Sequence, residues 1–263
     1  MYAFTYERPT SVADATKLAE AGSQLLAGGQ TLLASMKLRL SSPEQLVDLS
    51  GIPELAEINK DGDGVRIGAM ARHVAVANNA NVRSMIPALA DLASHIGDRQ
   101  VRAMGTIGGS VANNDPAACY PAAVLALNGT VKTTKREIAA DDFFQGMFTT
   151  ALEAGELITS IRFPVAKRAA YVRQRQQASR FALVGVFVAD TTSGVRVAVT
   201  GAGNGVFRHQ GLEDALSKDF SAKAAAGVEI DPSDLNSDIH ASAEYRANLI
   251  GVLAQRAVTK ALG

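Results

Sequence analysis

The distribution of apolar and polar residues divides the chain into three stretches that each mix helix and strand. In the first stretch Ser11 is a favourable N-cap residue with Asp14 three positions later, which predicts a helix over residues 11–20. An apolar run over residues 24–27 predicts a buried strand, and a helical segment is expected over residues 30–40. Residues 1–52 are therefore predicted to form a small lobe of helix and strand.

The second stretch contains a strong hairpin signal. Short apolar runs at 55–58 and 65–69 flank the sequence Asp-Gly-Asp-Gly at 61–64, which is typical of two antiparallel strands joined by a tight turn. Helices are expected over residues 87–95 and 116–127, and strands over residues 130–134 and 156–163. These elements predict a second lobe over residues 53–165, with a linker at 164–168.

The third stretch is rich in β-branched and aromatic residues at its start and helical at its end. Strands are expected over residues 170–175, 181–189 and 196–200, which predicts an antiparallel sheet of three strands. Helices are expected over residues 211–216, 222–227 and 242–262, the last with an apolar face. The pattern thus predicts an α+β chain with a sheet-plus-helices domain over residues 166–263.

The composition excludes several function classes. Lys plus Arg equals Asp plus Glu at 26 each, so no net field attracts nucleic acid or a membrane surface. The N-terminal residues lack the basic and apolar parts of a signal peptide, and no run of about 18 apolar residues occurs. We expect a soluble, cytoplasmic protein that binds no nucleic acid.

The cysteine and histidine content predicts that no metal is bound. Cys119 is the sole cysteine, which excludes an internal disulfide and a cluster held by four thiolates of this chain. The four histidines are scattered without a metal-binding spacing. Any redox reaction would therefore depend on an organic cofactor here or on metals of another chain.

Candidate chemistry is concentrated in residues 104–127. If the glycines of this stretch adopt positive φ, consecutive N–H groups converge on an anion such as phosphate; these glycines are Gly105, Gly108 and Gly109. Short polar side chains suited to hydroxyl groups follow, namely Asn113, Asn114 and Asp115. An ordinary surface turn is the alternative interpretation of the same composition.

A second glycine pair favours the cofactor interpretation. Residues 25–33 read LLAGGQTLL, an apolar run followed by two glycines and a helix start. This order of strand, turn and helix aims a helix N-terminus at phosphate, and two such sites suit a dinucleotide. No P-loop motif occurs, the stretch GAGNGV at 201–206 lacks the third glycine of a Rossmann motif, and no Ser-His-Asp grouping supports hydrolysis.

The two glycine stretches closely resemble the FAD motifs of the medium, flavin-carrying subunit of molybdenum hydroxylases. This family includes aerobic carbon monoxide dehydrogenase and bacterial relatives of xanthine dehydrogenase. The matching motifs are AGGQTL at 27–32 and QVRAMGTIGG at 100–109, and further matches are IGAMARH at 67–73, DFFQG at 142–146, GELITSIRFP at 155–164 and AEYRANLIGVLAQRAV at 243–258. Their order and spacing agree with the family from about Tyr2 to the C-terminus.

The resemblance implies a fold, a role and partners. The fold is the two-lobed FAD-binding fold of the vanillyl-alcohol-oxidase-like (PCMH-type) group, followed by a C-terminal domain. The implied role is to pass electrons from two two-iron two-sulfur clusters of a small iron–sulfur subunit through FAD to a quinone, NAD or oxygen. Substrate would be oxidised on a large molybdopterin subunit, and a dimer of heterotrimers is expected.

The resemblance also implies which residues meet FAD, and none is implied to be catalytic. The backbones of both motifs would cradle the diphosphate, Asn113 would reach the ribityl and adenosine parts, and Ile158 would pack against the flavin. Arg175 would place a cation near the isoalloxazine, with a solvated strand charge as the alternative. The residues expected at the cofactor are Ala27, Gly28, Gly29, Gln30, Thr31, Leu32, Gly105, Thr106, Ile107, Gly108, Gly109, Asn113, Asp115, Cys119, Ile158 and Arg175.

One position departs from the family pattern, and two other functions compete. Related sequences usually carry an aspartate where this chain has Cys119, so weaker FAD binding is expected unless Asn113, Asp115 or Tyr120 compensates. A free-standing FAD oxidoreductase of the same fold is one alternative, although no acid–base set is evident. A scaffold subunit without flavin is another, and the intact glycines argue against it.

Overall fold

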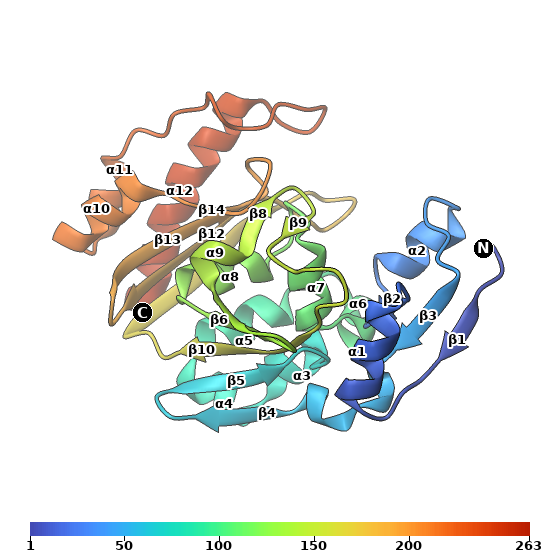
Figure 1. Ribbon diagram of the computed structural model, residues 1–263. Helices are drawn as coiled ribbons and strands as arrows, with labels where there is room; N and C mark the ends of the chain where they lie inside the picture. Colours follow the sequence, from blue (N-terminus) through green and yellow to red (C-terminus); the bar gives the residue numbers. More distant parts are fainter.

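The computed structural model describes residues 1–263, and its first sheet belongs to the N-terminal residues. The parallel strands β1 (Thr5–Glu7), β3 (Gln45–Asp48) and β2 (Gln24–Leu26) lie in that order. The helices α1 (Val12–Glu20) and α2 (Leu32–Lys37) connect them, and this part lies to one side in Figure 1. The Ser11 side chain accepts from the Asp14 N–H, which confirms the predicted cap.

Two details of this region were predicted wrongly. The strand over residues 24–27 is not buried, because β2 is an edge strand and its residues stay partly exposed. The helix expected to reach Leu40 ends at Lys37, because Arg39 adopts a left-handed conformation with φ 61° that no α-helix accommodates.

The second sheet has five antiparallel strands in the order β4-β5-β10-β6-β7. Their bounds are β4 (Ile58–Asp61), β5 (Gly64–Gly68), β10 (Ile158–Pro164), β6 (Thr130–Thr133) and β7 (Glu137–Ala139). Asp61 pairs with Gly64, which confirms the predicted hairpin. The short 3-10 helices η1 (Leu49–Gly51) and η2 (Pro53–Ala56) precede β4, so the strand predicted to begin at residue 55 begins at Ile58.

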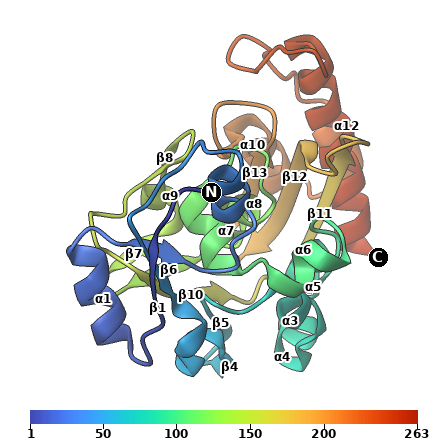
Figure 2. The same cartoon turned by 90° about the vertical axis from the view of Figure 1, so that its right-hand side faces the viewer.

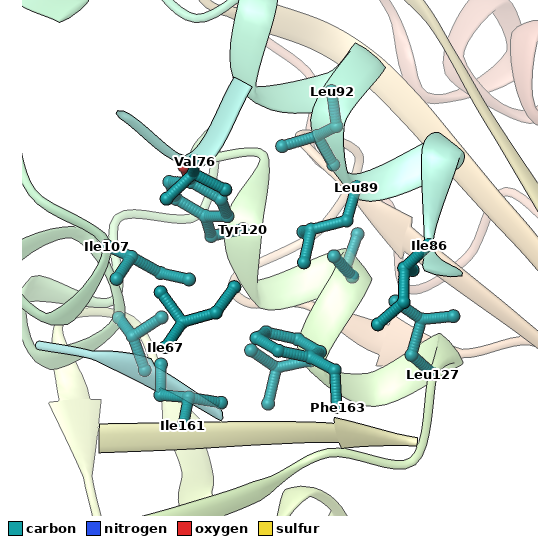
Figure 3. Close-up of a cluster of buried hydrophobic side chains, with 14 of the residues drawn as sticks. Ile67, Val76, Ile86, Leu89, Leu92, Ile107, Tyr120, Leu127, Ile161 and Phe163 are labelled. Atoms are coloured by element: carbon teal, nitrogen blue, oxygen red, sulfur yellow. The ribbon is translucent and has the colours of Figure 1, made fainter. Parts of the chain in front are cut away.

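Helices accompany this sheet, and their apolar side chains form the largest core. Figure 3 shows Ile67 and Ile161 of the sheet facing Leu89 and Ile107 of the helices. The helix bounds are α3 (His73–Asn78), α4 (Ala80–Met85), α5 (Pro87–Ser94), α6 (Arg99–Met104), α7 (Ile107–Asn113), α8 (Tyr120–Ala126) and α9 (Ala140–Phe143). A small hairpin of β8 (Phe144–Gly146) and β9 (Thr149–Thr150) follows α9.

The helix predicted over residues 116–127 begins only at Tyr120. The carbonyl of Pro116 accepts from the Gly201 N–H at 2.8 Å, and the Thr200 hydroxyl donates to Pro116 and Ala118. A contact with a distant strand therefore holds residues 116–118 outside the helix.

The last sheet is antiparallel and has four strands, not the three that were predicted. The strands are β11 (Arg168–Arg175), β12 (Ala182–Thr191), β13 (Gly194–Thr200) and β14 (Phe207–Arg208). The fourth was missed because two residues carry no periodic signal. Helices α10 (Gln210–Lys218), α11 (Ala222–Ala226) and α12 (Ala243–Leu262) complete this part, and Figure 2 shows α12 along β11 and β12.

The three larger sheets fall within residues 1–52, 53–165 and 166–263, and the division into lobes at these boundaries stays a prediction. The last two parts share a core, because Tyr171 and Phe187 belong to the same apolar cluster as Ile67. The buried Arg196 joins them further, since it donates to the Leu125 carbonyl at 2.8 Å and pairs with Asp141. None of the helices has both the length and the apolar character needed to cross a membrane.

Candidate functional site

A cavity of about 660 Å³ lies between the N-terminal residues and the rest of the chain, and both glycine stretches line it. Three parts of the chain line it. These are the N-terminal part from Ala19 to Leu49, the middle part from Ala69 to Ile158, and the segment from Arg173 to Phe181. Folding thus brings together two motifs that are some seventy residues apart in the sequence.

The backbone N–H groups of the first motif make no hydrogen bonds within the chain. None of the N–H groups from Ala27 to Leu32 donates a hydrogen bond within the chain, and all of these residues line the cavity. The loop leads directly into α2, which begins at Leu32. Unpaired backbone donors at the start of a helix are suited to an anion, so this loop is a candidate anion site.

Two glycines make the loop possible for different reasons. Gly29 adopts φ +69°, a conformation that L side chains rarely take. Gly28 has no room for a side chain, since an added Cβ would lie 2.3 Å from the carbonyl oxygen of Met104. Gly28 therefore lets the first motif pack directly against the backbone of Met104 and Gly105 in the second motif.

The second motif has a different conformation from the one predicted. Gly105 has φ −61°, and residues 107–113 form the helix α7 with Thr106 as its N-cap, so no nest of positive φ exists there. The N–H groups of Ile107 and Gly108 donate to the carbonyls of Ala71 and Ala69 at 3.0 and 2.8 Å. These two donors are therefore unavailable to a phosphate, and the anion site rests on the first motif.

Close packing explains the glycines of the second motif. A Cβ on Gly108 would lie 2.5 Å from the Cβ of Ala69, and a Cβ on Gly105 would lie 2.5 Å from the Nε2 of His73. The predicted contact residue Ile107 is fully buried and lies in the apolar cluster of Figure 3. It does not line the cavity. Its place in the motif reflects packing of α7 against β10 and α8.

The polar residues after the second motif divide into two groups. Asn113 and Asp115 line the cavity, and the Asn113 side chain makes no hydrogen bond within the chain. The Asn114 side chain is buried and donates at 2.8 Å to the carbonyls of Gly146 and Thr149, so it supports the β8–β9 hairpin. The Asp115 carboxylate accepts from the Ala117 N–H at 2.8 Å.

Arg173, and not Arg175, is the cation that β11 brings to the cavity. The pairing of β11 with β12 shifts register between Gln174 and Arg175, so Arg175 lies beyond a bulge at the exposed end of the strand. Arg173 donates to the Cys119 thiol, with 3.1 Å between Nη1 and Sγ, and to the carbonyl of His95.

His73 is a cavity residue that the sequence analysis missed. It is buried, its ring lies 5.3 Å from that of Tyr120, and its Nδ1 has no hydrogen-bond partner. Burial, with a smaller effect from Arg102, lowers the pKa of His73 to about 4, so its imidazole is neutral at neutral pH. Tyr120 lies in the core and does not line the cavity, so it cannot compensate for Cys119.

Glu156 and Ile158 contribute the wall at the start of β10. Burial alone would raise the pKa of Glu156, but hydrogen bonds from Thr133, the Glu153 N–H and Arg136 lower it below its usual value. Glu156 is therefore a paired carboxylate that adds little free charge to the cavity. Contact between Ile158 and a flavin ring stays a prediction.

The cavity thus collects most of the predicted residues and omits two. It is lined by Ala27, Gly28, Gly29, Gln30, Thr31, Leu32, Gly105, Thr106, Gly108, Gly109, Asn113, Asp115, Cys119 and Ile158, but not by Ile107 or Arg175. The lining residues that were not predicted include His73, Glu156, Arg173 and Phe181. Two of them could have been predicted from the family motifs, because His73 ends the motif IGAMARH and Glu156 is the second residue of GELITSIRFP.

This arrangement fits a long anionic cofactor such as FAD. The first motif has backbone donors suited to a diphosphate, and the polar side chains of Asn113 and Asp115 are suited to sugar hydroxyls. No group of three or more His, Cys, Asp or Glu is placed to hold a metal ion.

Comparison with known proteins agrees with this fit. Residues 2–166 match the family model described as the FAD binding domain in molybdopterin dehydrogenase. The nicotine 6-hydroxylase medium subunit of Paenarthrobacter nicotinovorans is 36% identical over 98% of this chain and 97% of its own length. The carbon monoxide dehydrogenase medium chain of Afipia carboxidovorans is also 36% identical, over 98% of this chain and 96% of its own length.

Solved structures agree as well. A chain of carbon monoxide dehydrogenase from Hydrogenophaga pseudoflava superposes with a TM-score of 0.90 at 33% identity, covering 99% of this chain and 98% of the other. A chain of quinoline 2-oxidoreductase from Pseudomonas putida 86 gives a TM-score of 0.90 at 29% identity, covering 99% and 97%. The fold is thus the PCMH-type FAD-binding fold, and this chain belongs to the family of FAD-binding medium subunits of molybdenum hydroxylases.

Proposed function

We propose that the chain binds FAD in the cavity and serves as the electron-transfer subunit of a heteromeric molybdenum hydroxylase. The observation that carries the proposal is the loop Ala27–Leu32, whose N–H groups have no hydrogen-bond partner in the chain and whose residues line a cavity shared by both motifs. Its relatives over nearly the whole chain are medium subunits of such enzymes.

Different residues of the cavity wall are proposed to bind different parts of FAD. The first motif holds the diphosphate through its backbone N–H groups, which need no lysine or arginine beside them. Asn113, Asp115 and Thr106 line the cavity, and we assign the sugar and ribityl hydroxyls to their side chains. Arg173 adds a positive charge to the wall. When bound, FAD supplies the ability to take up electrons singly and to release one or two at a time.

The partners of the proposed complex supply what this chain lacks. Substrate oxidation takes place on a large molybdopterin subunit, and a small iron–sulfur subunit delivers the electrons to this chain. The electron acceptor is a quinone, NAD or oxygen, and the complex is a dimer of heterotrimers in the cytoplasm. The single cysteine supports this assignment, because clusters held by thiolates must lie on another chain.

The first test is the cofactor of the isolated chain. The purified protein is expected to bind FAD without a covalent bond, because Cys119 is buried against Arg173 and no histidine lies in either glycine motif. After acid precipitation the flavin should appear in the supernatant. Flavin retained in the pellet would contradict non-covalent binding, and a chain that takes up no FAD would support the scaffold alternative.

The second test separates the electron-transfer subunit from a free-standing oxidoreductase. The flavin of the isolated chain should be reduced by dithionite but not by carbon monoxide, aldehydes or nitrogen heterocycles. A substrate of the complex should reduce it once the molybdopterin and iron–sulfur subunits are added. Direct reduction by one of these compounds without partner chains would favour the free-standing enzyme.

A further inference from the structure

Arg173 is an unpaired cation in the wall of the cofactor cavity. It forms no salt bridge, and its hydrogen bonds go to the Cys119 thiol and the carbonyl of His95. Asp91 pairs with Lys260 at 2.7 Å, and Asp98 caps α6 and lies 4.0 Å from Arg180. The charge of Arg173 is therefore not cancelled by a neighbouring carboxylate.

Two neutral groups fix the position of its guanidinium. Nη1 donates to the Cys119 thiol at 3.1 Å, and Nη2 donates to the carbonyl of His95, the C-cap residue of α5. A helix C-terminus attracts a cation, so this second contact is favourable. Because a guanidinium has five N–H donors, it retains donors that can face a ligand in the cavity.

The position of Cys119 is set by hydrogen bonds to the residues before it and by the start of α8 after it. It is 5% exposed and precedes the first residue of α8, where the hydrogen bonds of Thr200 hold residues 116–118 in place. The Tyr171 hydroxyl is buried beside the thiol and has no hydrogen-bond partner of ordinary geometry. Burial raises the pKa of Tyr171 well above its usual value, so this neighbour also stays uncharged.

The two ends of the cavity differ in charge. The wall near the N-terminal helix carries no cation; it combines the apolar Ala19, Leu25, Leu49 and Leu157 with Ser23, Gln24 and the paired carboxylate Glu156. The wall from residues 173–181 carries Arg173, Arg180 and Phe181. Adenine keeps its charge in a redox reaction while the flavin ring gains negative charge on reduction, so we assign the ring system to the cationic wall.

We infer that Cys119 is a positioning residue whose thiol holds Arg173 in the cavity wall without neutralising it, so that the full positive charge raises the reduction potential of the flavin. The inference rests on the proposed function, since it requires FAD in the cavity. A carboxylate at position 119 would pair with Arg173 at this distance and cancel the charge that the thiol leaves free.

The test is the midpoint potential of FAD bound to the isolated full-length chain, measured by spectroscopic titration against a dye of known potential. Cys119→Asp cancels the charge and Arg173→Gln removes it, so both are expected to lower the potential. A tenfold change in the ratio of affinities for oxidised and reduced FAD corresponds to about 30 mV for the two-electron couple, and at least this shift is expected.

Two variants serve as matched controls. Cys119→Ser keeps a small uncharged acceptor for Arg173, and Arg175→Gln removes the neighbouring charge that lies outside the cavity. Both should bind FAD with the wild-type potential. A merely structural role for Cys119 would alter FAD occupancy or stability but leave the potential of the bound flavin unchanged.

The outcomes separate this inference from the proposed function. Bound FAD with an unchanged potential in Cys119→Asp or in Arg173→Gln would overturn the inference and leave the function intact. An equal shift in Cys119→Ser and Cys119→Asp would also overturn it, because the effect would not follow charge. A wild-type chain that binds no FAD would overturn the proposed function and the inference together.

Discussion

The neighbouring residues Asn113 and Asn114 provide a sharp test of the site. The Asn113 side chain lines the cavity, whereas the Asn114 side chain supports the β8–β9 hairpin. In Asn114→Ala the β8–β9 hairpin loses two hydrogen bonds of 2.8 Å to the carbonyls of Gly146 and Thr149. These carbonyls are only partly buried, so each bond contributes about 1 kcal/mol. Asn114 also has φ 43°, where alanine is less favourable than asparagine by up to about 1 kcal/mol.

The expected loss for Asn114→Ala is therefore about 3 kcal/mol in the free energy of unfolding, or roughly 6 to 10 °C in Tm for a chain of this size. The Oδ1 atom of Asn114 has no partner, so its removal adds no cost. Asn113→Ala is the matched control, because its side chain lines the cavity and bonds to nothing in the chain. It should leave stability within about 0.5 kcal/mol and weaken FAD binding about fivefold.

Urea unfolding of the chain without FAD measures the first quantity, and FAD titration of the folded variants measures the second. The two variants should show opposite patterns, with stability lost in one and affinity lost in the other. If Asn114→Ala unfolds like wild type, the hairpin contacts do not stabilise the fold. If Asn113→Ala binds FAD normally, the cofactor does not reach α7.

Gly28→Ala should lower both stability, by about 1 to 3 kcal/mol, and FAD affinity, because its Cβ would lie 2.3 Å from the backbone oxygen of Met104. Gly203→Ala, whose Cβ would meet nothing closer than a Phe207 ring atom at 3.5 Å, is the control, and equal thermal unfolding of the two variants would contradict this packing argument. The pKa of His73 is lowered to about 4, so the unfolded chain binds a proton that the folded chain does not, and folding should lose up to about 3 kcal/mol as pH falls from 6.5 to 4. His73→Gln should lack this part of the pH dependence, and parallel stability curves for wild type and variant would show that His73 is solvated.

Local patterns in the sequence determined the elements with strong local causes and indicated the loop that is proposed to bind the cofactor. The cap at Ser11, the hairpin at residues 61–64 and the long C-terminal helix follow from side chains within a few positions of each other. The need for glycine at position 29 is also local, because the turn itself requires a positive φ there. The resemblance to the family of FAD-binding medium subunits then predicted the fold and the cofactor.

Tertiary structure decided which residues of each motif face the cavity. The donors of Ile107 and Gly108 are bonded to carbonyls of residues 71 and 69, a pairing that no local pattern encodes. The bulge after Gln174 leaves Arg173 in the cavity wall and Arg175 at the exposed end of the strand, although both positions share the same alternation in sequence. The neutral contact between Cys119 and Arg173 spans 54 positions, so the charge of this wall depends on how β11 packs against the start of α8.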